Sequence, residues 1–347
     1  MIEDKDFLKN CSMVKTFLML LVVLGHSCLF WGGGWASPMK PIISCHALGV
    51  FAAWLNSFHI YAFVLVSGYL FYYVKFERRN EKYLSVKKHL HNKFRRLIVP
   101  YVATSFFWVI PLSLCVGVFG SSTDFVAKFV FGKSPSQLWF LLMLFGVFVF
   151  SYFFADLWKR NNLFGLTIAI VFYFIGICGM KLDLNYFQFF SSCTYLICFF
   201  SGFKIRQYPC LVQKLLRFPL LLWIVIDVSL FAVSLYSIPF FSQIICKIML
   251  SCFLHIWGAV GAFVVLHKLL LILPAFGQIF FASISKYTMP IYLLHQQIVY
   301  VVIYYLNGLV NPYINAMANF IISLTLSTLM SVVLMRFKLT RFLIGEK

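Results

Sequence analysis

The sequence predicts an all-α membrane protein with about ten transmembrane helices and both ends of the chain in the cytoplasm. Three observations indicate this class: of the 347 residues 62% are hydrophobic, only 11% are charged, and the mean hydropathy is +0.90. An ordinary soluble domain is about 25% charged. A helix needs roughly 20 mostly apolar residues to cross a bilayer, and runs of that size recur along the chain. We therefore interpret residues 1–347 as a single integral-membrane domain.

The first apolar run is predicted to be a retained helix over residues 14–31. The stretch 1–10 carries several charged residues, and no small-residue cleavage site closes the run, so we do not expect a signal peptide. The apolar segment 268–285 contains Pro274 and Gly277, and we expect it to lie along the inner interface of the membrane. The other spans are predicted at 52–74, 97–118, 137–157, 163–180, 187–203, 218–236, 246–266, 287–306 and 313–335.

The positive charges predict the orientation of these helices. With the N-terminus inside, most of the 29 Lys and Arg residues fall in cytoplasmic segments. The exceptions are Lys40, Lys128, Lys133, Lys181 and Lys247. Cytoplasmic loops of membrane proteins are enriched in Lys and Arg, so both termini are expected in the cytoplasm. We attribute the net charge of +19 to this placement at the lipid bilayer, and we expect no nucleic-acid partner.

The most basic of the predicted inner loops runs from Lys75 to Arg96. Two interpretations of this loop remain open. It could anchor the protein electrostatically on anionic lipid headgroups. It could equally receive a polyanionic donor from the cytoplasm, because Arg and Lys hold phosphate groups at close range.

Ionisable side chains inside the predicted spans are the first candidates for a functional site, because burying such a group in a membrane is costly. His26 follows Lys15 by 11 residues, which at 1.5 Å per residue places it about 16 Å deeper. His59, in the second span, falls at a comparable depth and could face the same pocket. His295, in the ninth span, shares a helix face with Tyr292. Burial favours the neutral imidazole, which can accept a proton.

Several other residues have more than one interpretation. Trp139 begins the fourth span and is either an interfacial aromatic anchor or a substrate contact. Asp227 and His255 are interpreted as a structural pair and not as catalytic groups. The ten cysteines lack metal-ligand spacing, and we expect no metal. No phosphate-binding loop, nucleophile elbow or paired-carboxylate motif occurs, so the predicted chemistry rests on histidine.

Five short segments follow one another in a fixed order. They are VKTFLMLLVVLGHS with Lys15 and His26, FHIYAFVLVSGYLF at 58–71, KFRRLIVPY at 93–101, LWFL at 138–141, and SKYTMPIYLLH at 285–295. Together they resemble the acyltransferase-3 family of integral-membrane acyltransferases, especially its fucose O-acetylase-like branch. Much of the family has Arg where this chain has Lys15 and Asp where it has Ser12, and Lys offers a phosphate a charge but not a planar fork.

The resemblance implies a ten-helix enzyme of the bacterial inner membrane. Such an enzyme takes an acyl group, usually from cytoplasmic acetyl-CoA, to a hydroxyl of a cell-surface or lipid-linked saccharide. By this hypothesis His26 is the catalytic base or transient acyl carrier. The CoA phosphates would dock on Lys15, Arg95 and Arg96. The residues expected to shape the pocket and stabilise the oxyanion are His59, Ser67, Tyr292 and His295, with Trp139 as a substrate contact.

Two other classes of function remain as alternatives. A glycan flippase or polymerase would share the topology and the basic inner loops, although the sequence has no repeated halves with interrupted helices. A haem-binding electron carrier would use His26 and His59 as iron ligands. The sequence also leaves a homo-oligomer open.

Overall fold

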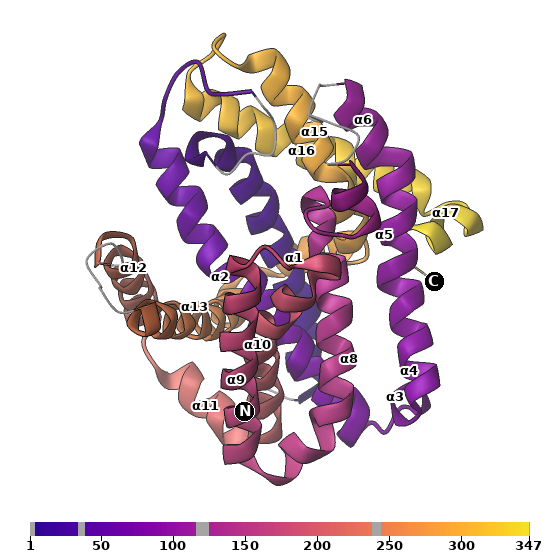
Figure 1. Cartoon of the computed structure of the whole chain (residues 1–347), viewed down its shortest axis with the longest axis vertical. Helices are drawn as coiled ribbons and strands as arrows, with labels where there is room; N and C mark the ends of the chain where they lie inside the picture. Colours follow the sequence, from indigo (N-terminus) through magenta and orange to yellow (C-terminus); the bar gives the residue numbers. More distant parts are fainter. Residues whose placement is uncertain (1–3, 34–38, 116–124, 238–243, 347) are drawn as a thin grey trace.

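The computed structural model describes residues 4–33, 39–115, 125–237 and 244–346, and within these ranges every regular element is a helix (Figure 1). Among the described residues, eight helices are long and apolar enough to cross a membrane, or nine if the bent pair Pro209–Arg217 and Leu220–Tyr236 forms one span. The all-helical membrane class is therefore confirmed. The predicted span 187–203 corresponds to α10, Phe189–Gln207, which is not among these candidates. Serine and threonine interrupt its first turns, and it is mostly buried inside the protein.

The long helices are α1 Asp4–Leu29, α2 His46–Tyr72, α8 Trp139–Arg160, α9 Asn162–Lys181, α10 Phe189–Gln207, α12 Leu220–Ser237, α13 Ile244–Ile272, α15 Thr288–Leu306 and α16 Pro312–Leu334. The shorter α-helices are α3 Glu81–Leu84, α4 Val86–Lys93, α5 Val99–Thr104, α6 Ile110–Cys115, α11 Pro209–Arg217, α14 Ala275–Ser285 and α17 Lys338–Leu343. The eleven-residue α14 lies within the segment predicted to follow the membrane interface, and that placement stays a prediction.

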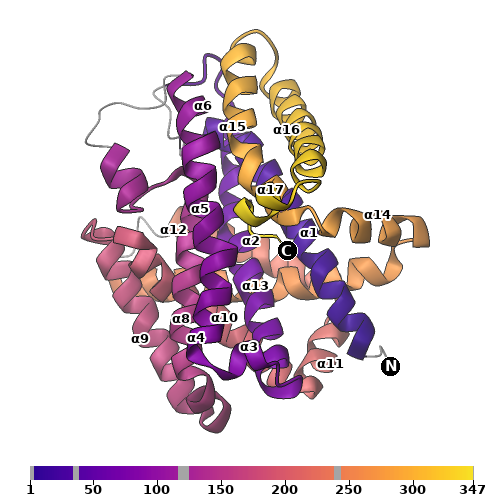
Figure 2. The same cartoon turned by 90° about the vertical axis from the view of Figure 1, so that its right-hand side faces the viewer.

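The helices α4, α5 and α6 follow one another as a single column in Figure 2. Two π-helical turns join them, at Phe94–Ile98 and Ser105–Val109. Each turn is followed closely by a proline, Pro100 in the first case and Pro111 in the second. Proline has no N–H and its ring clashes with the carbonyl four residues earlier, so the wider π turn lets the helix continue. The π turns also change which side chains face the interior, and the first of them contains Arg95 and Arg96.

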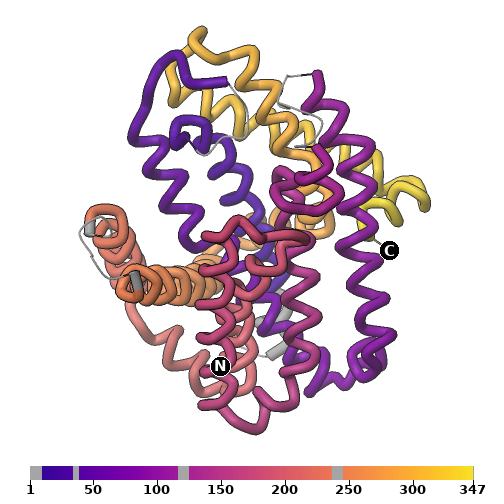
Figure 3. The backbone as a smooth tube through the Cα atoms, viewed as in Figure 1, coloured from indigo at the N-terminus to yellow at the C-terminus, as the bar shows by residue number. Residues whose placement is uncertain are grey.

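The first long helix packs against the last two long helices of the chain. Figure 3 shows the first helices, in indigo, beside the last, in yellow, and α1 contacts both α15 and α16. The helices α8, α9 and α10 pack beside one another on the other side of α2 (Figure 1). This arrangement places α1, α2, α8 and α15 around a common interior.

Two glycines allow α2 and α10 to touch through their backbones. A Cβ atom on Gly202 would lie 1.9 Å from the carbonyl oxygen of Leu65, and one on Gly68 would lie 2.0 Å from that of Phe199. Small residues commonly permit such close approach of membrane helices. No side chain can be accommodated here unless the two helices separate.

We expect Gly202→Ala to destabilise the protein by about 3 kcal/mol, because the added methyl group overpacks a backbone contact. Thermal unfolding in detergent measures this effect. Gly277→Ala is the matched control, since its Cβ would lie 3.4 Å from the nearest atom, an ordinary contact. If the Gly202→Ala protein unfolds at the same temperature as the wild type, the close packing of α2 and α10 is contradicted.

Candidate active site

A cavity of about 240 Å³ lies between α1, α2, α8 and α15. Side chains three or four residues apart form its walls, as expected when one face of each helix is turned inward. The α1 wall consists of Ser12, Lys15, Met19 and Val22. The α15 wall, with the residues just before that helix, consists of Ser285, Thr288, Met289 and Tyr292.

The next residue along each of these two walls is a histidine. His26 follows Val22 by four residues on α1, and His295 follows Tyr292 by three on α15. Nδ1 of His26 and Nε2 of His295 are 2.8 Å apart, and the rings are nearly parallel, with centroids 5.0 Å apart. Neither ring lines the cavity itself, which ends one helical turn away.

The hydrogen bonds of His295 determine which nitrogen atoms carry protons in the neutral pair. Nδ1 of His295 lies 2.8 Å from the carbonyl oxygen of Tyr292, and a carbonyl can only accept, so this Nδ1 is protonated. A neutral imidazole has one N–H, so Nε2 of His295 is the acceptor and Nδ1 of His26 donates to it. This leaves Nε2 of His26 with a lone pair. The pair thereby presents His26 as a base in a fixed orientation.

His59 is buried, with 1% of its surface exposed, but it has a different local partner. Its Nδ1 is hydrogen-bonded to the carbonyl oxygen of Leu55 on the same helix. Depth in the membrane suggested His59 as the neighbour of His26. In the described part of the chain, the histidine that is hydrogen-bonded to His26 is His295.

The buried amides of Gln137 and Gln297 hold α15 in place, although neither residue was a predicted site residue. Nε2 of Gln137 donates to Oε1 of Gln297 at 2.7 Å and to the carbonyl oxygen of Leu293 at 2.9 Å. The hydroxyl of Tyr292 donates to the carbonyl oxygen of Gln137, so this hydroxyl is already engaged. The sequence does contain a signal for this contact: Gln137 begins the predicted span 137–157, and a buried amide needs hydrogen-bond partners.

One end of the cavity is basic. Lys15, Lys93 and Arg96 line it. Lys93 is only 7% exposed, and its Nζ lies 3.3 Å from the centre of the Phe148 ring. Among the residues that the structure describes, no carboxylate comes within 4 Å of these three side chains, so none of them is held in an ion pair there. Glu346 also lines this end; burial raises its pKa and the charge of Arg96 lowers it in part.

Arg95, predicted with Arg96 as a donor-binding residue, lies elsewhere. Its guanidinium group lies over the ring of Phe342 in α17, 5.3 Å from the ring centre, and it does not line the cavity. Both arginines belong to the π turn Phe94–Ile98, and this turn directs only Arg96 inward. The third basic residue of the cavity is therefore Lys93, and not Arg95 as predicted.

The remaining predicted site residues are divided between two spaces. Ser67 lines the cavity, and its hydroxyl donates to the carbonyl oxygen of Phe63 at 2.9 Å. Trp139 lies apart from Ser67 and Tyr292, in a separate hollow beside Tyr195. The structure thus places Ser67 and Tyr292 at one space and Trp139 at another, and their contact with a substrate stays a prediction.

Asp227 and His255 do not pair with each other, contrary to the sequence interpretation. Asp227 accepts a hydrogen bond of 2.9 Å from Nε1 of Trp54. His255 is 3.1 Å from the hydroxyl of Tyr173, and its ring stacks on Tyr61 with centroids 3.9 Å apart. Each group instead has an aromatic partner on another helix, while Oδ1 of Asp227 is buried without a hydrogen-bond partner among the described residues.

Comparison with known proteins gives one match. A family model described as an acyltransferase domain, that of acyltransferase-3, matches residues 11–336. No curated protein and no solved structure matches the chain. Among the described residues, no group of three His, Cys, Asp or Glu side chains is placed to hold a metal ion.

Proposed function

Because this chain belongs to the acyltransferase-3 family, which the match over residues 11–336 shows, we propose that it is an O-acetyltransferase. Its donor is cytoplasmic acetyl-CoA, and its acceptor is a hydroxyl of a cell-surface or lipid-linked saccharide. We place it in the inner membrane of a bacterium with both termini in the cytoplasm. In support, Ser12 and Glu346, near the two ends of the chain, line the same cavity.

The observation that carries the proposal is the continuous α1 face from Lys15 to His26. Eleven residues make about three helical turns, so the two side chains share one face. A thioester donor with a polyphosphate at one end and an acyl group at the other matches this order. The phosphates bind at Lys15, Lys93 and Arg96, and the acyl arm extends along Met19 and Val22 toward His26. The side chains of Val22 and Tyr292 must move aside for the thioester to reach the imidazole of His26.

In the proposed reaction, Nε2 of His26 removes the proton from the acceptor hydroxyl as its oxygen attacks the thioester carbonyl. The C–O bond forms, the C–S bond breaks, and the CoA thiolate leaves with the electron pair of that bond. The imidazolium returns its proton to the thiolate, so the products are the acetyl ester and CoA. His295 holds the imidazole in the tautomer that this step requires.

The function is tested with purified protein in lipid nanodiscs, acetyl-CoA labelled in the acetyl group, and saccharide from the producing cell as acceptor. We expect label in the saccharide and one CoA released per ester formed. Mass spectrometry of surface saccharide from cells with and without the gene identifies the modified residue. Release of CoA without any labelled saccharide, and no mass difference between the cells, would refute the proposal.

The donor site predicts unequal roles for two neighbouring arginines. Arg96→Gln should raise the KM for acetyl-CoA about tenfold or more, since a hydrogen bond to a charged group contributes about 1.5–3 kcal/mol. Arg95→Gln removes the same charge one residue away and serves as the matched control, with a change below about threefold. The KM values of both variants, measured at fixed salt, check this. Equal effects of the two changes would mean that general positive charge, and not the cavity, attracts the donor.

A further inference from the structure

The hollow beside Tyr195 has a volume of about 290 Å³. Like the cavity, it is lined by residues of α2 and α8. Adjacent residues of α2 face the two spaces, Ile60 the cavity and Tyr61 the hollow. Adjacent residues of α8 divide in the same way, with Phe140 facing the cavity and Trp139 the hollow. The hollow and the cavity therefore lie on different faces of α2 and α8.

The loops that border the hollow have an unusual backbone. Among the described residues, five that are not glycine have positive φ, and four of these flank the hollow. They are Ser136 at 53°, Asp183 at 58°, Phe187 at 50° and Gln188 at 57°. Left-handed conformations are costly for such residues and persist where the surrounding structure enforces them, often at ligand sites.

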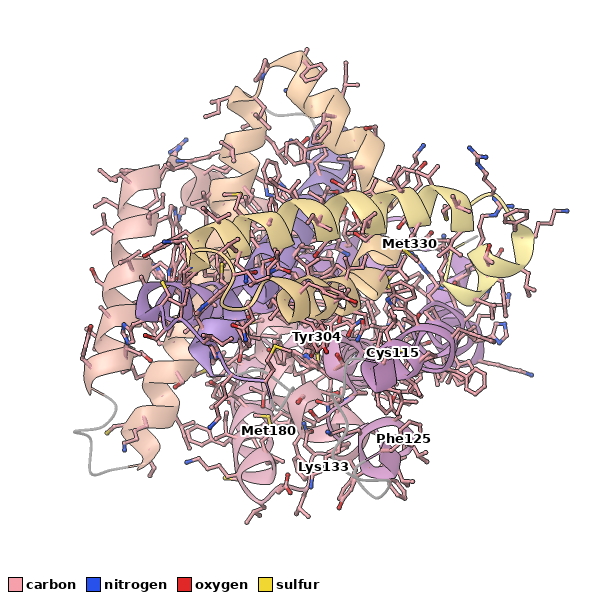
Figure 4. The ribbon with its side chains drawn as sticks, turned by 90° about the horizontal axis from the view of Figure 1, so that it is seen from above. Cys115, Phe125, Lys133, Met180, Tyr304 and Met330 are labelled. Carbon is pink, nitrogen blue, oxygen red and sulfur yellow. The ribbon has the colours of Figure 1, made fainter. Side chains whose placement is uncertain are left out.

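Specific hydrogen bonds enforce this conformation. Nε2 of Gln188 donates to the carbonyl oxygens of Gly132 and Lys133, each at 2.8 Å. The backbone N–H of Phe187 donates to the carbonyl oxygen of Phe131 at 2.7 Å. These bonds tie the segment before α8 to the segment before α10. Lys133 and Met180, both in the lining and both labelled in Figure 4, lie near each other in that view.

The lining combines aromatic faces with hydroxyl groups. Trp139 and Tyr195 contribute rings whose centroids are 5.8 Å apart, and Tyr61 supports Tyr195 from behind, stacked between it and His255 at 4.2 Å and 3.9 Å. Ser191 and Thr194 add hydroxyl groups. A sugar ring has an apolar C–H face and a rim of hydroxyls, which aromatic faces and short polar side chains complement.

The charge of the lining favours an uncharged sugar. Lys133 is the cation among the lining residues, and it already forms an ion pair with Asp183. A ligand carboxylate would have to compete with that pair, whereas a neutral ring would not. The segments around Lys133 and Lys181 are also those that the charge distribution of the sequence places outside the cytoplasm.

We propose that this hollow is a subsite for one neutral sugar ring of the acceptor, with Trp139 and Tyr195 as its specificity-determining residues; this rests on the proposed acyl transfer to a saccharide. A series of ring contacts leads from the subsite to the histidine pair. Trp139 and Phe140 are 6.4 Å apart, Phe140 and Tyr292 5.5 Å, and Tyr292 and His295 5.9 Å. A ring bound here anchors the saccharide while a neighbouring residue of the same saccharide presents its hydroxyl to His26.

The subsite is tested by direct binding without any acyl donor. The probes are the methyl glycosides of glucose, galactose and rhamnose, titrated by saturation-transfer NMR against the full chain in lipid nanodiscs. We expect at least one probe to bind, Trp139→Ala to weaken it about tenfold, and Trp139→Phe to retain most of the affinity. Trp31→Ala, a tryptophan outside both spaces, is the matched control and should bind as the wild type does. Absence of binding for all three probes, or wild-type affinity in Trp139→Ala, overturns the subsite.

The transfer assay separates this inference from the proposed function. In Trp139→Ala we expect a higher acceptor KM, an unchanged KM for acetyl-CoA, and unchanged hydrolysis of acetyl-CoA in the absence of acceptor. Transfer by the wild type combined with an unchanged acceptor KM in Trp139→Ala would reject the subsite and leave the function standing. Sugar binding that depends on Trp139, in a protein that transfers no acetyl group, would reject the function and leave the subsite.

Discussion

His26→Ala should lower the rate of acetyl transfer by about 100- to 10,000-fold, the usual contribution of a positioned general base. The lone pair on Nε2 is lost, and in the described part of the chain no other histidine is hydrogen-bonded to His295 to replace it. Because the proposed phosphate-binding residue Lys15 lies three turns away, the affinity for acetyl-CoA should change little. Single-turnover transfer and donor titration measure the two quantities separately.

The control for this prediction is His46→Ala, which removes an exposed histidine at the start of α2. That variant should transfer acetyl groups at the wild-type rate. The thermal unfolding of His26→Ala should remain within a few degrees of the wild type, so that loss of activity is not loss of fold. Transfer by His26→Ala at more than about one tenth of the wild-type rate would remove His26 from the chemistry.

His295→Ala should lower kcat about 10- to 100-fold, as is typical when the residue that orients a functional histidine is removed. Without its acceptor, Nδ1 of His26 loses the 2.8 Å hydrogen bond that fixes both ring orientation and tautomer. His295→Gln should recover part of the loss, because an amide oxygen can accept from the same N–H. Steady-state kinetics of both variants check this, with KM for acetyl-CoA expected to stay constant.

A merely structural role for His295 predicts a different pattern. Both substitutions would then lower stability and kcat together, and glutamine would give no more recovery than any side chain of similar size. His295→Met, which matches glutamine in length but cannot accept as an amide does, provides that comparison. Equal activity of the Met and Gln variants would reject the positioning role.

The fold class could be predicted from the sequence because a bilayer imposes a simple requirement on helix length and apolarity. The limit of that argument appears at α10, where serine, threonine, Lys204 and Arg206 make the helix too polar to be a candidate span although it is long enough to cross. The prediction of about ten spans compares with eight or nine candidates in the part of the chain that the structure describes. The hydrophobic periodicity and the length of a segment describe one helix at a time. They do not show whether lipid or other helices surround it.

The site could be predicted in part, and each failure has a local physical cause. The spacing of Lys15 and His26 on one helix was accessible, whereas the bond between His26 and His295 depends on packing across 269 residues of sequence. The choice between Arg95 and Arg96 depends on a π turn, which breaks the 3.6-residue period used to assign helix faces. The partner of Asp227, Trp54, lies on another helix, and the periodicity of one helix does not indicate which residues of another it contacts.

The central claim is that a thioester donor enters from the basic end of the cavity and reaches His26. The most direct test is the structure of the protein bound to a ketone analogue of acetyl-CoA that cannot release its acyl group. We predict the analogue phosphates at Lys15, Lys93 and Arg96, and its carbonyl carbon within about 6 Å of Nε2 of His26, one hydrogen bond plus one attack distance away. An analogue bound outside this cavity, or one whose carbonyl remains on the Lys15 side of Val22 and Tyr292, would contradict the account.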